Sequence, residues 1–235
     1  MGTPGWLSRR RADVPPADWW LGEHERHVLA GLRFERRRDD WRLGRWTAKA
    51  ALSRWLGVPC TRIEVLAAAD GAPEAWVDGA PAPVAVSLSH RGGRALAVVD
   101  SAPGAVGCDL ELVEPRSDAF VREWLAGSEQ QLVRRCDEPR RPLMANLIWT
   151  AKEAAAKVRR EGLRLDVRGA VVTLPDGAPD AALVGRWEQL RVDWPDGAGT
   201  TRGWYRVEPG WVMAIAADPA AAVPRELLDA AHAIV

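Results

Sequence analysis

The sequence predicts an α+β fold, and three features of the chain support this prediction. Residues 147–158 are strong helix formers without glycine or proline, which predicts a helix. Residues 105–112 alternate apolar and polar side chains, the pattern of a half-buried strand. Residues 94–103 and 210–219 echo one another, because both are apolar, strand-like runs that lead to an aspartate and a proline. The echo is weak by itself, and it hints at a duplicated α/β unit.

The composition is that of a globular protein. A chain of 235 residues can form one sizeable domain or two small ones, and 47% apolar residues argue against disorder. The 32 basic residues equal the 32 acidic ones, which argues against bulk nucleic-acid binding. No apolar run reaches the length of a membrane span and no signal-peptide pattern is present, so a cytoplasmic location is the default expectation. Three widely spaced cysteines indicate neither a disulfide framework nor a zinc site.

Two helices are predicted near the start, at residues 22–32 and 39–56, the second ending at the Gly-Val-Pro of residues 57–59. Four basic side chains of the second helix fall within a narrow arc. They are Arg38, Arg42, Arg45 and Lys49. A solvated helix face is the ordinary explanation of such a stripe. The rest of this helix is largely apolar, so the stripe would border the core, and a phosphate pocket is the alternative.

Strands and turns follow. A strand is expected at residues 63–66 and a turn at 70–73, and residues 84–99 predict a hairpin around a glycine-rich turn. Ser89 and His90 close its first strand. Adjacent strand residues point to opposite faces and no G-x-S-x-G motif occurs, so a serine hydrolase is not expected. A lone histidine at a strand end is most often structural or simply exposed.

The break at residues 101–104 predicts a boundary between an N-terminal lobe, 1–104, and a C-terminal lobe, 105–235. In the second lobe, residues 118–135 read as helical with a new segment starting at 127. Strands are expected near 167–174, 182–190 and 204–207, with turns at 175–177 and 195–197, and a short helix after Pro224.

Two acids of the strand at residues 105–112 suggest a metal. Asp109 and Glu111 lie on one face, roughly 6 to 7 Å apart, where their charges repel. A divalent cation between them would relieve the repulsion, and magnesium prefers such hard oxygen ligands. An exposed strand end with two solvated acids explains this octet equally well.

The helix at residues 147–158 has a polar side that carries Trp149, Lys152, Glu153, Lys157 and Arg160. The ordinary explanation is a solvated face with a weak Glu153–Lys157 pair at i,i+4 spacing. Two observations count against it. A large aromatic side chain lies among the charges, and the acidic strand lies upstream.

Together, residues 107–111 and 149–157 resemble the paired signature of the 4′-phosphopantetheinyl transferases, approximately G-x-D-x-E followed by W-[ST]-x-K-E-x-x-x-K. The length of the chain and its upstream half are similar to the larger, monomeric type that activates polyketide and peptide synthetases, not to the short trimeric type. The resemblance implies two similar α/β lobes related by a pseudo-twofold axis, with the coenzyme cleft between them.

The activity that the resemblance implies is transfer of 4′-phosphopantetheine from coenzyme A to a serine of a carrier protein, with release of adenosine 3′,5′-bisphosphate. Magnesium, or manganese in its place, would be held by Asp109, Glu111 and Glu153. Glu153, directly or through a metal-bound water, would accept the serine proton. Lys157 would neutralise the leaving phosphate, and Lys152 would steady the pyrophosphate or the acids. Trp149 would orient the helix beside the site.

Coenzyme contacts also follow from the resemblance. The basic helix would hold the 3′-phosphate through Arg42, with Arg38, Arg45 and Lys49 as weaker candidates. The family usually carries Gly-[Arg/Lys]-Pro at residues 71–73, and Ala72 departs from that pattern. Contacts there would come from the backbone or packing of Gly71 and Pro73. In the hairpin, Ser89 precedes His90, which would bind the coenzyme's phosphates.

Two further expectations come from the resemblance. Glu129 matches a family glutamate near the metal, although a first-turn acid favoured by the helix dipole explains it as well. The charged loop at residues 137–142 would help to dock the carrier protein.

Two rival functions remain open. A coenzyme- or nucleotide-binding module without catalysis could use the same basic stripe and hairpin. A nucleic-acid-binding protein could use the arginines and the 13 tryptophans, but the balanced charge makes it the weakest candidate.

Overall fold

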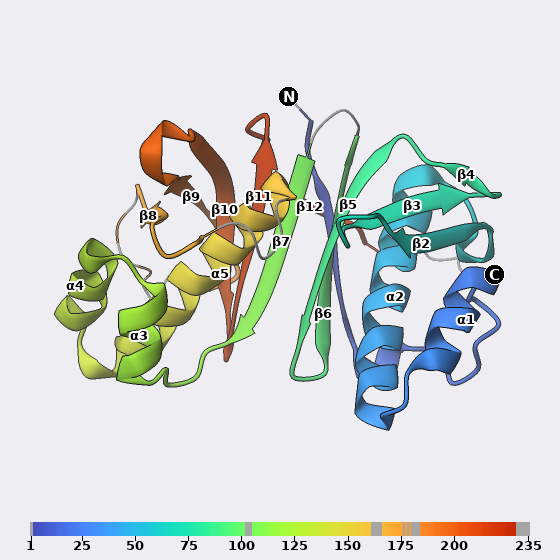
Figure 1. Ribbon diagram of the computed structural model, residues 1–235, viewed down its shortest axis with the longest axis horizontal. Helices are drawn as coiled ribbons and strands as arrows, with labels where there is room; N and C mark the ends of the chain where they lie inside the picture. The colour runs from blue at the N-terminus through green and yellow to red at the C-terminus, as the bar shows by residue number, and fades with distance from the viewer. Residues whose placement is uncertain are drawn as a thin grey trace.

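The computed structural model describes residues 2–101, 105–160, 166–175, 177, 179 and 184–228, with residue 196 described by its backbone alone. Figure 1 shows two halves side by side, with α1, α2 and β2–β4 at one end and α3–α5 with β8–β10 at the other. The fold is mixed α+β, as the sequence predicts. None of the described helices combines the length and apolar character that a membrane crossing requires.

The first half begins with a strand and two helices and ends in a long hairpin. Its elements are β1 (Gly5–Arg10), α1 (Glu23–Gly31), α2 (Glu35–Leu56), β2 (Ile63–Ala67), β3 (Pro73–Val77), β4 (Ala80–Pro81), β5 (Val84–Arg91) and β6 (Arg94–Ser101), with 3-10 turns η1 (Arg11–Asp13) and η2 (Cys60–Arg62). Gly57 ends α2 in the left-handed conformation, with φ of 70°, which glycine adopts without a steric penalty.

The second half repeats the order of a strand, helices and strands. Its elements are β7 (Ala105–Leu112), α3 (Asp118–Trp124), α4 (Gly127–Arg135), η3 (Glu138–Arg140), α5 (Arg141–Arg159), β8 (Val171–Thr173), β9 (Trp187–Asp193), η6 (Pro195–Gly197), β10 (Thr200–Glu208), β11 (Trp211–Asp218) and β12 (Arg225–Glu226). The break expected within residues 118–135 and the hairpin at 84–99 are confirmed. The short helix expected after Pro224 is wrong for residues 225–226, which extend and pair with β1.

Two sheets form the middle of the molecule. One has the order β12-β1-β6-β5 and the other the order β7-β11-β10-β9-β8, while β2, β3 and β4 form a small third sheet. Apolar side chains of β1, β6, β7 and β11 pack between the two large sheets. A second cluster lies between α2 and the first sheet, and a third between α5 and the second sheet. Each long helix therefore covers the outer face of one sheet (Figure 1).

Strand β7 is covered on both faces, whereas the sequence predicts a half-buried strand. Val106, Cys108 and Leu110 pack between the sheets, and the opposite face lies against α5. Gly107 allows this close approach, because a Cβ there would lie 2.0 Å from the Ala154 carbonyl oxygen of α5. The absence of a side chain at residue 107 thus brings the acidic strand directly against the helix.

A buried ion pair joins α1 to α2. The ammonium of Lys49 lies 2.6 Å from Oε2 of Glu25 and also donates to the Trp20 carbonyl. Glu25 accepts from the amide of Gly22, the residue that caps α1, and from the amide of Val65 in β2. Both side chains of the pair are fully buried. The expectation from the sequence that Lys49 binds a phosphate is therefore wrong, because its ammonium is buried and paired with Glu25.

The second half contains the same arrangement between α4 and α5. The ammonium of Lys152 lies 2.7 Å from Oε2 of Glu129 and donates to the Trp124 carbonyl. Glu129 accepts from the amide of Ala126, the residue that caps α4, and from the amide of Val172 in β8. The sequence predicts that Lys152 steadies the pyrophosphate or the acids and that Glu129 lies close to the metal and phosphate region. The structure pairs these two side chains with each other in the core. The two halves thus share one set of hydrogen bonds around a buried Glu–Lys pair.

The lobe boundary predicted at residues 101–104 falls on residues 102–104, which lie outside the described part of the chain. The described strands on either side are β6, which ends at Ser101, and β7, which begins at Ala105. The expected turn at 175–177 and strand at 182–190 likewise lie in part outside the described residues.

Candidate functional site

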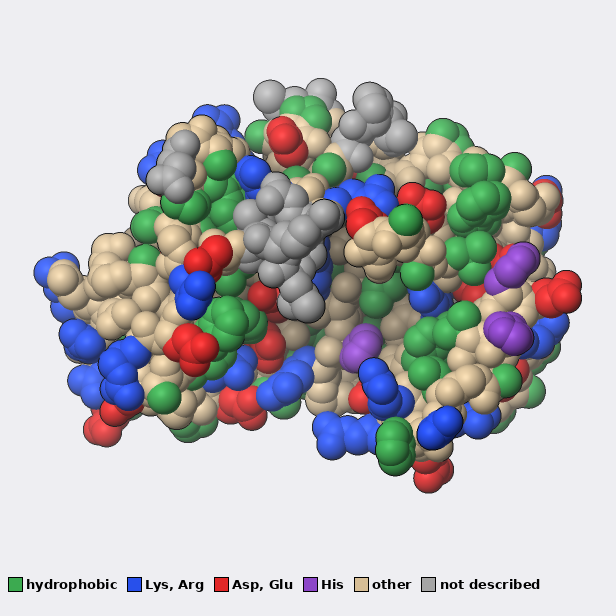
Figure 2. Space-filling model, in the orientation of Figure 1, with side chains coloured by type: hydrophobic (Ala, Val, Ile, Leu, Met, Phe, Trp, Pro, Cys, Tyr) green, Lys and Arg blue, Asp and Glu red, His purple; other side chains and the backbone are tan. Residues whose placement is uncertain are grey.

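A cavity of about 990 Å³ lies between the two halves. Figure 2 shows a hollow there, with a histidine and charged side chains of both signs around it. The walls come from α2, the loop before β3, β5, the start of β7, and α5. The lining residues that bear on function are Trp41, Arg45, Asp70, Gly71, Pro73, Glu74, His90, Trp124, Trp149, Glu153, Lys157 and Arg160.

Asp109 is the buried acid of β7, with a relative exposure of 6%. Its Oδ1 accepts from the Ser89 hydroxyl at 2.7 Å and from the Lys157 ammonium at 3.0 Å. Its Oδ2 is buried and has no hydrogen-bond partner among the described residues. A buried carboxylate oxygen without a partner is unusual. Ser89, expected at the coenzyme, instead orients this acid.

Glu111 lies two residues further along β7, between two arginines. Its Oε2 is 3.1 Å from Arg116 and 3.5 Å from Arg91. Arg116 is itself fixed by a 2.7 Å hydrogen bond to the Asn146 side chain. Desolvation and the charge of Asp109 raise the pKa of Glu111, and the two arginines oppose that shift. Arg91 and Arg116 therefore balance part of the negative charge of Glu111.

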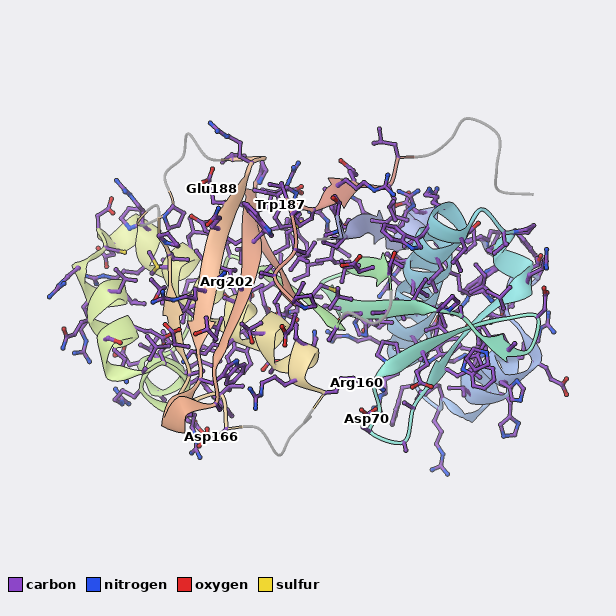
Figure 3. All side chains as sticks on the ribbon, turned by 90° about the horizontal axis from the view of Figure 1, so that it is seen from above. Asp70, Arg160, Asp166, Trp187, Glu188 and Arg202 are labelled. Carbon is purple, nitrogen blue, oxygen red and sulfur yellow. The ribbon has the colours of Figure 1, made fainter. Side chains whose placement is uncertain are left out.

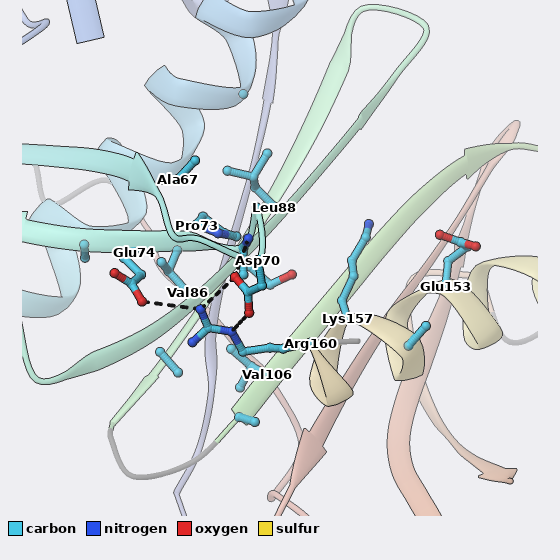
Figure 4. Close-up of a pocket in the computed structure, with 18 of the residues that line it drawn as sticks. Ala67, Asp70, Pro73, Glu74, Val86, Leu88, Val106, Glu153, Lys157 and Arg160 are labelled. Carbon is cyan, nitrogen blue, oxygen red and sulfur yellow. Dashed lines mark hydrogen bonds and ion pairs between the residues drawn. The ribbon is translucent and has the colours of Figure 1, made fainter. Parts of the chain in front are cut away.

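Glu153 projects from α5 and lines the cavity (Figure 4). Burial raises its pKa, the charges of Asp109 and Glu111 raise it further, and Lys157 opposes them. The charges of Asp109 and Glu111 therefore act on Glu153. Among the described residues, however, no group of three His, Cys, Asp or Glu side chains is arranged to hold a metal ion.

Lys157 lies one turn after Glu153 on α5. Its ammonium donates to the Cys108 carbonyl at 2.8 Å and to Asp109 at 3.0 Å. Desolvation disfavours its charged form, but the carboxylates of Asp109 and Glu153 outweigh that effect, so the pKa of Lys157 is raised. Lys157 therefore stays a cation at neutral pH, which suits it to neutralise an anion rather than to accept a proton.

His90 stands at the end of β5, at the exposed mouth of the cavity. Desolvation by the cavity walls lowers its pKa, while the carboxylate of Asp40 raises it in part. A Cβ at Gly44 would lie 3.4 Å from the His90 ring, so α2 runs close beside it. The ring of His90 therefore lies beside α2 at the cavity.

The basic stripe of α2 divides in the structure. Arg45 lines the cavity, stacks on the Trp41 ring at 5.2 Å, and has a buried Nε without a partner among the described residues. Arg42 turns away and bonds the Pro15 carbonyl and Asp18. Arg38 is exposed and outside the cavity lining. Of the four expected anion ligands, the structure brings only Arg45 to the cavity.

The loop at residues 70–73 forms one wall of the cavity and includes Gly71 and Pro73. Gly71 has φ of +86°, a conformation that glycine adopts freely. Ala72 donates its amide to Asp70 at 3.0 Å. The pKa of Asp70 is lowered, first by hydrogen bonds from Arg160 and then by this amide. Desolvation would raise the pKa, but its effect is smaller.

Trp149 packs in an aromatic cluster at the other wall. Its ring centroid lies 5.3 Å from those of both Phe120 and Trp124, in edge-to-face geometry. Trp124, Asp70, Glu74 and Arg160 line the cavity, and sequence reasoning missed all four. The sequence offered two signals, Trp124 within the helix expected at residues 118–135 and Arg160 on the polar side of the later helix. Asp70 and Glu74 are defined by contacts between distant parts of the chain.

The cavity thus joins the cationic Lys157, the guanidinium of Arg45 and the ring of His90 to Glu153, an acid with a raised pKa, which suits an anionic ligand and a proton acceptor beside it. Residues 105–205 match the 4′-phosphopantetheinyl transferase superfamily. This superfamily domain runs from β7 into β10 and contains the three acids and Lys157. The match covers less than half of the chain and supports a transferase. No curated protein matches the chain significantly.

Proposed function

We propose that the protein transfers the 4′-phosphopantetheine arm of coenzyme A to a serine of an acyl or peptidyl carrier protein. The observation that carries this proposal is that Glu153 and Lys157 line the cavity and that Lys157 is bonded to the buried Asp109, all within the matched superfamily domain. A cavity of about 990 Å³ suits a ligand of coenzyme size.

The chemistry is a displacement at phosphorus. The serine oxygen attacks the phosphorus that bears the pantetheine arm, and the bond from that phosphorus to adenosine 3′,5′-bisphosphate breaks. The hydroxyl proton passes to Glu153, whose raised pKa suits a general base. The leaving phosphate gains charge beside the cationic Lys157. Positioning and charge neutralisation therefore account for the reaction.

We propose magnesium, with manganese as a substitute, as the metal of this site. Asp109, Glu111 and Glu153 would hold it. The unpartnered Oδ2 of Asp109 fits this role, and so does the mutual repulsion of the acids. The arginines lie 3.1 and 3.5 Å from Oε2 of Glu111 and would share this carboxylate with the cation. When bound, the cation would neutralise the diphosphate of the coenzyme.

The coenzyme's phosphates are assigned to Arg45 and His90, because both line the cavity. The backbone of Gly71 and the ring of Pro73 would pack against the rest of the nucleotide. Arg38 and Arg42 lie on the same helix outside the cavity lining, which makes Arg45 the best-placed arginine of the stripe.

The architecture is proposed to be two similar lobes, 1–104 and 105–235, related by a pseudo-twofold axis. The repeated Glu–Lys pairs on α1–α2 and α4–α5 support this division. We further propose the larger, monomeric, cytoplasmic type that serves polyketide and peptide synthetases.

The proposal is tested by incubating the protein with coenzyme A, magnesium and a panel of apo-carrier domains, and then weighing the carriers. A gain equal to one phosphopantetheine group on the carrier serine is expected. Coenzyme binding that needs no magnesium, with no mass gain on any carrier, would instead identify a non-catalytic binding module. Asp109→Asn is the matched inactive variant, and its circular dichroism spectrum should equal that of the wild type.

A further inference from the structure

The end of α5 is tied across the cavity to the loop before β3. Arg160 donates through Nε to Oδ2 of Asp70 at 3.0 Å, and through Nη2 to Oδ1 of Asp70 at 3.2 Å and Oε1 of Glu74 at 3.3 Å. Figure 4 shows these bonds at one side of the cavity, and Figure 3 shows Arg160 and Asp70 side by side between the halves. We call Arg160, Asp70 and Glu74 the Arg160 clasp.

The backbone of Arg160 is unusual. The residue caps α5 with φ of 54° and ψ of 24°, in the left-handed region. Glycine is the common residue at such a position, and other residues there carry backbone strain. Glycine would avoid this strain but has no side chain. An arginine in such a strained position suggests that its side chain has a function.

The clasp frames the cavity and does not fill it, because the cavity of about 990 Å³ is formed with the three bonds in place. Asp70 also holds the turn itself. It accepts from the Ala72 amide, while Ala68 and Ala72 are joined by a backbone hydrogen bond of 2.8 Å. The position of Arg160 is therefore transmitted through Asp70 to the wall at residues 71–73.

We propose that Arg160 is a positioning residue for coenzyme A, which fixes the wall at residues 71–73 in its coenzyme-binding position before the coenzyme arrives. This inference rests on the proposed function. Holding the loop in advance removes the ordering cost from binding and so raises affinity. The guanidinium of Arg160 is paired with two carboxylates through Nε and Nη2, so its proposed role is to hold the loop and not to bind a phosphate.

The test uses Arg160→Gly, Asp70→Asn and the double variant. Glycine suits the left-handed backbone, so Arg160→Gly removes the side chain and relieves the strain together. Trp41, Trp124 and Trp149 line the cavity, so quenching of tryptophan fluorescence reports the dissociation constant of coenzyme A without any turnover. The KM for coenzyme A, the KM for the carrier and kcat are measured in parallel.

Each single variant is expected to weaken coenzyme binding about threefold to tenfold, with kcat and the carrier KM unchanged. The double variant should be no weaker than either single variant, because both changes remove one shared interaction. Arg160→Ala should show the same affinity as Arg160→Gly but a lower Tm, since alanine retains the strain. Arg62→Ala, which breaks an Arg62–Asp78 pair away from the cavity, is the control and should leave affinity unchanged.

Asp70→Asn separates positioning from direct phosphate binding. If Arg160 bound a phosphate, neutralising Asp70 would free its guanidinium and tighten coenzyme binding. Tighter binding, additive losses in the double variant, or wild-type affinity in Arg160→Gly would overturn the inference. A wild-type protein that binds coenzyme A without transferring it would refute the proposed function alone, whereas no coenzyme binding would refute both.

Discussion

Lys152→Met gives the sharpest stability prediction. Lys152 has a relative exposure of 0% and Glu129 one of 2%, so the substitution leaves a buried carboxylate without its cation. Removing one partner of a buried ion pair costs about 3–5 kcal/mol. Glu129 would keep two donors, the amides of Ala126 and Val172. We therefore expect a loss near the lower end of that range, about 3 kcal/mol.

Urea unfolding followed by tryptophan fluorescence and circular dichroism measures this loss. Lys49→Met should lose a similar amount, because Glu25 is buried in the same way. Adding Glu129→Gln to Lys152→Met should restore at least half of the lost stability, since the orphaned charge is then gone. A loss below about 1 kcal/mol would refute the structural role, given the usual cost of an unpaired buried charge. If the double variant regains stability but no longer transfers phosphopantetheine, Lys152 would have a role in the active site beyond its structural one.

The remaining predictions concern the acidic strand and the helix beside it. Gly107→Ala places a Cβ 2.0 Å from the Ala154 carbonyl oxygen, so the strand and α5 must separate, at about 1–3 kcal/mol or more in a urea titration. An unchanged midpoint would contradict this contact. Glu153→Gln should lower kcat at least about 100-fold, because the amide cannot accept the serine proton, with an unchanged circular dichroism spectrum. Wild-type turnover would remove Glu153 from the proposed chemistry. Burial raises the pKa of the Cys108 thiol to about 12, so the folded protein should resist iodoacetamide at this residue at pH 8, as peptide mass mapping would show. The unfolded chain releases that proton first, so this group's contribution to stability falls as pH rises above 9.0 towards 12. Rapid alkylation of folded protein at Cys108 would refute this burial.

Local sequence patterns predicted most of the secondary structure. The glycine- and proline-free run at 147–158 lies within α5, and the alternating octet at 105–112 is β7. These patterns succeed because helix and strand periodicities are properties of neighbouring residues. The paired acidic and Trp-x-x-Lys-Glu motifs, the second at residues 149–153, also lie in the expected strand and helix.

Side chains that act over long distances along the chain were predicted poorly. Lys49 and Lys152 look solvent-facing on a helical wheel, yet each folds inward to a glutamate 24 and 23 residues earlier. A long lysine side chain can turn either way, and the decision depends on whether another element presents a buried carboxylate. Arg160 bonds to Asp70, which lies 90 residues earlier in the chain, and no local sequence pattern predicts such a contact.

The direct test of the account is the amount of adenosine 3′,5′-bisphosphate released for each carrier serine that gains mass. Transfer at the cavity predicts one molecule released per carrier modified, in the presence of magnesium, and none from the Asp109→Asn variant. Full release and modification by that variant, or no release from the wild type with any carrier of the panel, would contradict it.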